Sequence, residues 1–419
     1  MCRLLIFLFC ILIMVTSCGK KDQESAEEKT VLTYWRHFYA TEDRAVRELI
    51  QRFENKHPHI RIDYQSMPYQ GFREKLFATL QAGRGPDIMN IHNSWVYPFV
   101  KTGVVRAVPE SVLSADEAGR TCIPLISSCT VDGVLYGLPV GGGCLALFVN
   151  TDHVREAGLD PEIRPETWRE CEETALKLTK KSGSKIVRTG FACGGIKSQS
   201  WNYLVEGLFR QNGSRIINRG KTRVLWDSDE GKEAFTWYLS FIREHHIFTL
   251  DFEKPVNIFM DGSASMIVDL NVIVRKLKEQ APGIAYRIYP LPYRSTKATY
   301  GSCWANCVTT ACSENKKDAA FAFIRHLTSE DSARFWTEAT GEIPLYRSVL
   351  EDPQFRSAHK ELLPFILSME YAYSSLKKDE TAYKNAIVEA IEKVILRNVP
   401  PGTALEQAAE KVNAMLGAR

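Results

Sequence analysis

The segment 132–150, DGVLYGLPVGGGCLALFVN, constrains the fold of this chain more than any other stretch. Its runs 134–138 and 145–149 are rich in β-forming residues and are predicted as strand segments. Pro139 and the glycines 141–143 stand between them and predict a break in regular pairing. Because large changes of φ and ψ cost little at glycine, the break is interpreted as a hinge between two rigid bodies or as a surface loop.

Length and composition favour two lobes of an ordinary globular type. The chain has 419 residues, which is more than one hydrophobic core usually supports. Apolar residues make up 45% and charged residues 25%, the usual balance for a soluble protein. The 53 Lys and Arg barely exceed the 50 Asp and Glu and form no basic block, which argues against nucleic acid as a partner.

The first thirty residues predict export. Residues 1–17 are predicted as a lipoprotein signal peptide, because Arg3 precedes an apolar run that is too short to span a bilayer. The run ends in VTSC, which resembles a bacterial lipobox and implies lipidation, including palmitate, at Cys18. The alternative is an ordinary cleaved signal with an incidental cysteine. Residues 18–30 are expected to be a disordered tether that holds the protein at the periplasmic side of the cell membrane.

The order of elements after the tether is typical of an α/β fold. A strand at 31–35 precedes an amphipathic helix with Thr41 as its N-cap, and a second strand at 60–64 precedes another helix that Gly83 closes. This alternation predicts a mostly parallel sheet with helices on both faces.

Ligands of such sheets bind beyond the carboxyl ends of the strands. This rule selects Trp35 and His37 after the first strand, and His92, Asn93 and Trp95 after a strand at 88–91. Both groups combine an aromatic ring with hydrogen-bonding side chains, which is the combination that recognises sugars. For Trp35 a place in the core is an equally open interpretation.

Several blocks then resemble one family. The chain carries YGLP at 136–139, AGLD at 157–160 and PETW at 165–168, in the order found in the extracellular solute-binding proteins of sugar ABC importers, of the bacterial family 1, maltose-binding-protein-like type. The resemblance extends from about residue 31 almost to the C-terminus.

The resemblance implies an α/β, two-lobed periplasmic-binding-protein-like fold, with a mostly parallel sheet flanked by helices in each lobe and a hinge between the lobes. The N-terminal lobe is expected to comprise residues 31–140 and 292–345, and the C-terminal lobe residues 141–291 and 346–419. The implied function is a lipid-anchored monomer that captures a carbohydrate in the cleft between the lobes and delivers it to an ABC permease. Neither enzymatic activity nor a cofactor or metal is expected.

The family pattern also nominates site residues. FMDGSASM at 259–266 resembles a family block that many sugar binders follow with a tryptophan, whereas this chain has Asn271 and Val272 there. That departure weakens the case for a long oligosaccharide and leaves Asp269 and Asn271 as polar candidates. Arg347 lies one residue from the family's arginine position. The complete expected ligand-binding set is Trp35, His37, His92, Asn93, Trp95, Gly142, Trp201, Asp269, Asn271, Gly301, Trp304, Arg347 and Tyr383.

Two alternatives remain open. A glycerol-phosphate-type or other polar solute is possible because Arg36, His37, His92 and Arg347 could hold an anion. A surface lipoprotein that serves as an adhesin or sensor could also keep this fold. The chain contains no G-x-S-x-G, H-E-x-x-H or P-loop motif, and the expected cleft segments hold few of the acids that a glycosidase needs.

Eight cysteines follow Cys18, and their spacing matches neither a zinc site nor a dense disulfide framework. Cys303 and Cys307 on one strand would lie about 13 Å apart, too far for a bond. Buried free thiols are therefore expected, and Cys122 with Cys129 is the pair to test first.

Overall fold

A computed structural model describes residues 29–192, 199–248 and 254–417. The expected signal peptide, Cys18 and most of the tether lie outside these residues. No helix in the described ranges is long and apolar enough to cross a membrane.

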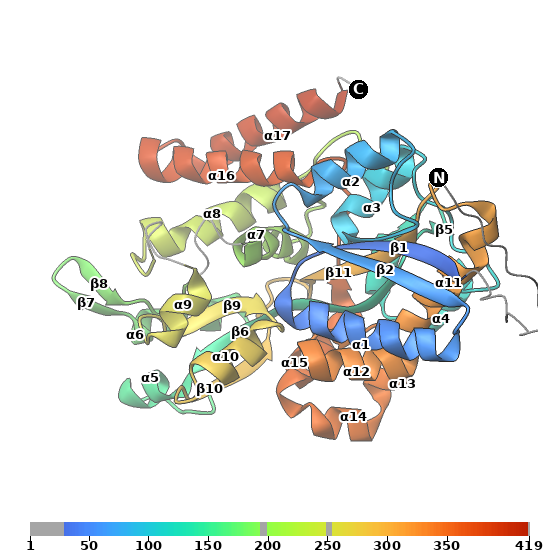
Figure 1. The fold of residues 1–419 in the computed structure, drawn as a ribbon. Coiled ribbons are helices and arrows are strands. Elements are labelled where there is room, and N and C mark those ends of the chain that lie inside the picture. Colours follow the sequence, from blue (N-terminus) through green and yellow to red (C-terminus); the bar gives the residue numbers. More distant parts are fainter. Residues whose placement is uncertain (1–28, 193–198, 249–253, 418–419) are drawn as a thin grey trace, which may run out of the picture.

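The first half of the chain forms the predicted α/β unit. Strand β1 (Thr30–His37) lies between β2 (Ile60–Met67) and β3 (Ile88–His92) and runs parallel to both. Helices α1 (Ala40–Lys56) and α2 (Phe72–Gln81) make the two crossovers. Figure 1 shows α2 and α3 (Asn93–Lys101) on one side of these strands and α1 on the other.

Strand β11 (Thr299–Val308) joins this unit to the rest of the sheet. It pairs antiparallel with β3 and also with β6 (Leu138–Asn150), so the strand order is β10-β6-β11-β3-β1-β2. The chain therefore returns to the first half after residue 290, as expected. Helices α11 (Glu314–Leu327) and α12 (Glu330–Thr340) follow there and pack against the strands and α1.

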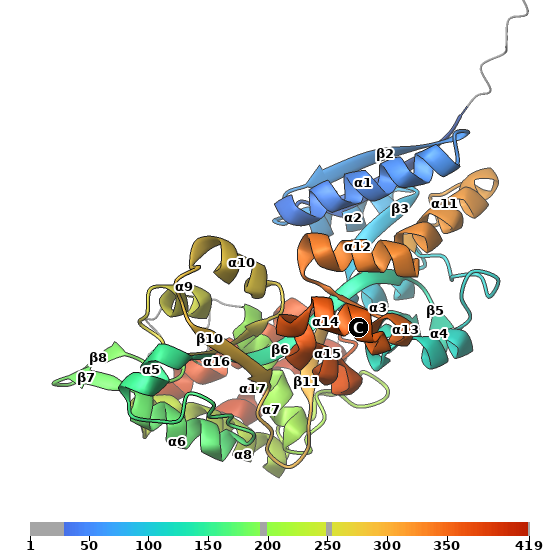
Figure 2. The same ribbon diagram turned by 90° about the horizontal axis from the view of Figure 1, so that it is seen from below.

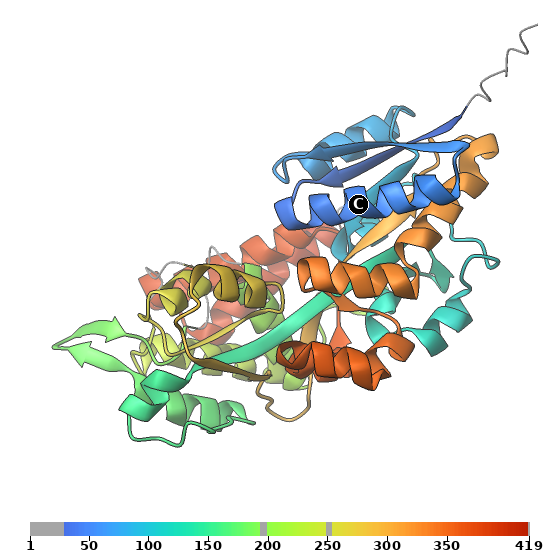
Figure 3. The same cartoon turned by 60° about the horizontal axis from the view of Figure 1, so that its bottom comes forward.

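The predicted break at the triple glycine is wrong. Strand β6 runs without interruption through Pro139 and the glycines 141–143, and Figure 3 shows it passing from one body of the molecule to the other. Gly142 pairs with Cys303 and Gly143 with Ser302. A Cβ on Gly143 would lie 2.0 Å from Oδ1 of Asn271, so glycine is needed here for close approach rather than for a loop.

The second half differs from the expected parallel sheet. Strand β6 pairs antiparallel with β9 (Met266–Leu270) and with β10 (Tyr286–Pro290), while isolated bridges make parallel contacts, from Thr189 and Ala192 to the β9 region and from Thr167 to Tyr293. Helices α5 to α10 gather at this end of β6 (Figures 1 and 2). The molecule thus has two bodies linked through β6 and β11, in agreement with the two-lobed α/β prediction.

The last helices pack on the second body, where α17 (Pro401–Gly417) contacts both α8 (Asp229–Arg243) and α16 (Glu380–Arg397). The residue boundaries predicted for the two lobes remain a prediction. The other elements are β4 (Thr130–Val131), β5 (Val134–Leu135), β7 (Lys180–Ser182), β8 (Lys185–Arg188), β12 (Ile343–Pro344), β13 (Ala372–Tyr373), α4 (Ala115–Thr121), α5 (Thr151–Glu156), α6 (Trp168–Leu178), α7 (Gln199–Gln211), α9 (Pro255–Met260), α10 (Ile273–Gln280), α13 (Arg347–Glu351), α14 (Pro353–Ala358) and α15 (Leu363–Ser368).

The cysteines of the described ranges confirm the prediction of buried free thiols. Cys122 and Cys129 are both unbonded, so the pair selected for testing is not formed. Cys193 lies outside the described residues. The other free, buried thiols are Cys144, Cys171, Cys303, Cys307 and Cys312.

Candidate functional site

Five aromatic rings meet where β1 and β3 end. Trp304 of β11 pairs with His92, the last residue of β3, and its indole stacks on the imidazole of His37 with ring centroids 3.7 Å apart. Trp95, in the first turn of α3, lies edge-on to Trp304 at 5.5 Å. Tyr69, from the loop before α2, closes the group at 6.1 Å from Trp95. We call these five residues the aromatic cluster.

Two of the tryptophans expected in the ligand site are neighbours in the cluster, namely Trp95 and Trp304. Their contact with a ligand stays a prediction. Trp201 falls within α7, but its side chain lies outside the described part of the structure. Sequence reasoning missed Tyr69, because it lies in a loop that no strand-end rule selects.

Both histidines of the cluster are buried, and burial disfavours the charged form of each. Burial, aided by the nearby Arg36, lowers the pKa of His37 to about 3, and burial also lowers the pKa of His92. The imidazole nitrogens of His92 lie 2.7 Å from Oγ of Ser94 and 2.9 Å from Oγ of Ser302. In contrast, Nδ1 of His37 is buried and has no hydrogen-bond partner within the described ranges.

A carboxylate reaches the cluster from the far end of the chain. Glu380 is the first residue of α16, and its carboxylate accepts a hydrogen bond from Ser94 and lies 3.9 Å from Nδ1 of His92. Although burial opposes it, the pKa of Glu380 is lowered by His92, by Lys377 and by the Ser94 hydroxyl. The group is therefore a buried anion. Sequence reasoning missed it, since an acid in the first turn of a helix is ordinary.

Lys377 fixes the segment that carries Glu380. Its ammonium forms an ion pair with Glu206 of α7, and the side chains of both residues are almost completely buried. The same carboxylate accepts a hydrogen bond from Ser375, and the hydroxyl of Tyr373 donates to the Glu206 carbonyl at 2.7 Å. These contacts hold the start of α16 in place beside the aromatic cluster.

The cluster opens into a cavity of about 340 Å³ between α2, α3, α7 and α16. One wall carries the rings of Tyr69 and Trp95, and the other carries amide, carboxylate and ammonium groups. Such a volume suits a small ligand. We call it the Trp95 pocket, and its main lining residues are Tyr69, Arg73, Glu74, Trp95, Asn202, Glu380, Lys384 and Asn385.

Arg36 is held by an acidic pair next to β6. It donates to Oε2 of Glu42 at 2.5 Å, and its guanidinium lies 5.2 Å from the Trp336 ring centre. Trp336 Nε1 donates to Glu342 at 2.7 Å. Burial raises the pKa of Glu42 to about 7 and also raises the pKa of Glu342. The one cation here is thus already matched with carboxyl groups.

Other expected site residues have packing roles. Trp35 lies under Lys75 of α2, with Nζ 5.4 Å from the ring centre, and its buried Nε1 has no partner in the described ranges. Asn93 is completely buried and accepts from the Cys303 amide at 3.4 Å. A Cβ on Gly142 would meet the Ser302 carbonyl at 2.8 Å, and one on Gly301 would meet Leu125 at 2.7 Å.

The remaining expected residues lie apart from the cluster. Asn271 is completely buried and donates to the Gly341 carbonyl at 2.7 Å, while Asp269 accepts from the following backbone amide at 2.8 Å. Arg347 forms an ion pair with Glu370 and lines a different cavity of about 590 Å³. Tyr383 belongs to the first turn of α16, and its ring is edge-on to Trp226 at 5.6 Å.

Comparison with known proteins agrees with this geometry. Residues 48–362 match the model of the family described as bacterial extracellular solute-binding protein. A Brucella abortus (strain 2308) protein named as a binding protein is 23% identical over 88% of this chain and 89% of its own length. The sn-glycerol-3-phosphate-binding periplasmic protein of Escherichia coli (strain K12) is 23% identical over 94% of each chain.

A solved structure supports the fold independently. The cyclic α-maltosyl-1,6-maltose binding protein of Arthrobacter globiformis superposes with a TM-score of 0.82 at 21% identity, covering 93% of this chain and all of its own. The family model and the two-lobed fold therefore agree over most of the sequence. This chain belongs to the bacterial extracellular solute-binding protein family, whose members serve ABC importers.

Proposed function

We propose that the protein captures a carbohydrate in the Trp95 pocket and delivers it to the permease of an ABC importer. The observation that carries this proposal is the composition of the pocket. The indole of Trp95 and the phenol of Tyr69 offer apolar faces, and Asn202, Glu380 and Asn385 offer donors and acceptors beside them. A sugar presents the matching surfaces, namely a C–H face and a rim of hydroxyls.

The buried charges favour a neutral ligand. An anion would need a buried cation that no carboxylate already holds. Arg36 is held by Glu42, Arg347 is paired with Glu370, and burial disfavours the charged forms of His37 and His92. None of the four groups that the sequence suggested for an anion is therefore available at the cluster. Glu380 adds a negative charge that would repel a phosphate.

A glycerol-phosphate-type solute is the second candidate. Arg73 and Lys384 line the same pocket, and neither has a carboxylate partner in the described ranges. The E. coli relative is named for sn-glycerol 3-phosphate. These two cations could hold a phosphate while the glycerol hydroxyls meet Glu380.

The mechanism of capture follows from the two bodies. Trp95 and Tyr69 belong to the proposed N-terminal lobe (31–140 and 292–345), and Asn202, Glu380 and Asn385 to the proposed C-terminal lobe (141–291 and 346–419). A ligand that contacts both lobes favours the closed form. The equilibrium between the open and closed forms can shift by no more than the difference in the ligand's affinity for the two forms. We expect a monomer, as one chain supplies both walls.

We further propose that lipidation of Cys18 tethers the protein to the outer side of the cell membrane. The support is the VTSC sequence and the polar segment 19–29 that follows. The tether would keep the ligand-loaded protein near its permease. A surface adhesin or sensor would use the same anchor, but it would have no need for closure on a ligand.

Calorimetric titration and solution scattering test the proposal together. The probes are glucose, maltose, maltotriose, sn-glycerol 3-phosphate and glycerophosphocholine, followed by a wider monosaccharide and oligosaccharide panel. Binding of a sugar with a decrease in the radius of gyration supports the carbohydrate proposal. Binding of the phosphates alone supports the second candidate. Binding of no solute, with no compaction, would favour the adhesin or sensor.

A further inference from the structure

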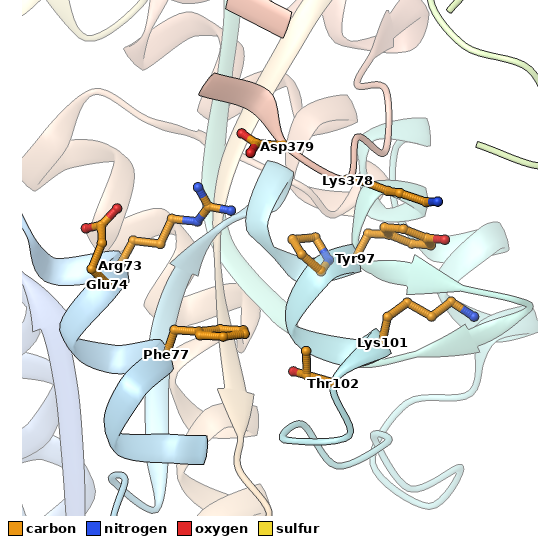
Figure 4. A pocket seen from close by; sticks show the side chains of 9 residues that line it. Arg73, Glu74, Phe77, Tyr97, Lys101, Thr102, Lys378 and Asp379 are labelled. Atoms are coloured by element: carbon orange, nitrogen blue, oxygen red, sulfur yellow. The ribbon is translucent and has the colours of Figure 1, made fainter. Parts of the chain in front are cut away.

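A second cavity continues the Trp95 pocket toward the outside of α2 and α3. Its volume is about 390 Å³, and Figure 4 shows its side chains. The two cavities share Arg73 and Glu74 as lining residues. We call the second one the outer pocket, and the lining residues that matter here are Phe77, Tyr97, Lys101, Thr102, Lys378 and Asp379.

The opposite wall is also continuous. Lys378 and Asp379 line the outer pocket, and the next two residues, Glu380 and Thr381, line the Trp95 pocket. One stretch of chain therefore borders both cavities, just as the first turns of α2 do on the other side. The two cavities are consecutive parts of one groove, with Arg73 at their junction. The guanidinium of Arg73 lies 5.9 Å from the Trp95 ring centre and, in Figure 4, its side chain extends toward Asp379.

The outer pocket repeats the chemistry of the inner one. Phe77 is 37% exposed although it is a large apolar residue, and its ring is edge-on to Phe99 at 5.4 Å. Its remaining face is available to a ligand. Thr102, Lys378 and Asp379 also line this pocket, and in Figure 4 the Lys378 side chain extends past Tyr97, away from Phe77. An apolar ring face beside both donors and acceptors again matches a sugar rather than a lipid or a simple anion.

We infer that the natural ligand is an oligosaccharide, with one sugar unit in the Trp95 pocket and the next in the outer pocket against Phe77. This inference rests on the proposed function and narrows its substrate class. The lack of a tryptophan at Asn271 and Val272 weakened the case for a long oligosaccharide, but neither residue lines the two cavities. The aromatic side chain of the second unit's site is instead Phe77.

The test compares ligands of increasing length. Calorimetric titrations use a panel of monosaccharides together with the di- and trisaccharides built from them, on the wild type and on Phe77→Ala. We expect the disaccharide to bind at least tenfold more tightly than its monosaccharide. Phe77→Ala should remove most of that gain and leave monosaccharide affinity unchanged, because the first unit does not contact Phe77.

Two further variants make the result decisive. Lys378→Ala removes another side chain that lines the outer pocket and leaves the aromatic cluster intact. It should lower the affinity for the di- and trisaccharides only. Leu396→Ala is the control, since Leu396 is 72% exposed near the end of α16, and it should change nothing. Circular dichroism and thermal unfolding of each variant verify folding.

The possible failures differ. Equal affinity for mono- and disaccharide, or a length gain that both outer-pocket variants leave intact, would overturn the inference while the proposed function stands. If no sugar of the panel binds, the proposed function itself fails, and the inference fails with it.

Discussion

The side-chain amide nitrogen of Asn271 lies 2.7 Å from the carbonyl oxygen of Gly341. This hydrogen bond joins the end of β9 in the second body to the end of α12 in the first. Gly341 adopts φ 79° and terminates α12, which leaves carbonyls of the last turn free to accept. Arg275 of α10 donates to another of them, that of Ala339. The polar residue that the sequence placed in the ligand site instead joins the two bodies beside β6.

Replacing Gly143 by alanine should destabilise the protein through Asn271. The new Cβ would lie 2.0 Å from Oδ1 of Asn271, and both groups are buried. We expect the free energy of unfolding to fall by about 1 to 3 kcal/mol, as for other overpacked sites. Urea denaturation measures this change.

A double-mutant cycle identifies the cause. In an Asn271→Ala background the clash is absent, so Gly143→Ala should cost much less, with a coupling energy of about 0.5 to 3 kcal/mol. Purely additive effects would show that the close approach of Gly143 and Asn271 is not what requires glycine.

Trp95→Ala should weaken ligand binding by about 1 to 3 kcal/mol, because the indole forms the apolar wall of the pocket. The substitution should also lower stability, by about 3 to 5 kcal/mol, since Trp95 is only 6% exposed and packs against Trp304. Titration calorimetry at a temperature where the variant is folded separates the two effects, and unchanged affinity would remove Trp95 from the site.

Glu380→Gln should reduce affinity for the ligand about tenfold, and it should also lower the free energy of unfolding, because the folded protein stabilises the charge that the substitution removes. The amide keeps the shape of the side chain, but it loses the charge that strengthens hydrogen bonds from ligand hydroxyls. Glu389→Gln is the matched control, because it lies on the same helix but forms ion pairs with Lys393 and Lys411 on the surface. Equal effects of the two substitutions would argue that Glu380 has no contact with the ligand.

Stability should depend on pH through His37. Its pKa is lowered to about 3 in the folded protein, whereas an unfolded chain has the ordinary value near 6.5. Between these values the unfolded state binds one proton more, so the free energy of unfolding decreases as the pH falls from about 6.5 toward 3. The slope from this one group is at most about 1.4 kcal/mol per pH unit.

His37→Phe tests this origin. Phenylalanine can retain the stacking on Trp304 and does not titrate, so the variant should lose less stability on acidification than the wild type. Urea unfolding at several pH values measures the difference in the free energy of unfolding between the wild type and His37→Phe. Contributions of other titrating groups such as Glu42 are common to both proteins and cancel in this difference. His59→Gln, at an exposed histidine, provides the comparison. Parallel curves for wild type and His37→Phe would contradict the assignment.

Cys18→Ala should release the protein from membranes when the signal peptide is retained. Fractionation of cells and mass spectrometry of the N-terminus measure anchoring and lipidation. Membrane association that persists without the cysteine would count against a lipid anchor.

The sequence by itself determined the local elements and the family. The alternation of β1, α1, β2, α2 and β3 follows from hydrophobic periodicity and capping, which depend on neighbouring residues only. Because parallel strands present their carboxyl ends at one edge, the strand-end rule selected His37, His92 and Trp95, which the structure brings together in the aromatic cluster. The resemblance added Trp304, which the structure places against His37.

Only the tertiary structure decided which distant segments complete the site. Glu380 lies beside His92 because the ion pair between Lys377 and Glu206 holds the start of α16 in place. Lys377 and Glu206 are 171 residues apart in the sequence, so no local pattern predicts their contact. Likewise the glycines of β6 predicted a break, because glycine has a low strand propensity. In the structure, pairing with β11 keeps the strand continuous, and the close approach of Asn271 requires glycine at position 143. Periodicity encodes which face of an element is buried, whereas the partner that buries it is set by the packing of the whole chain.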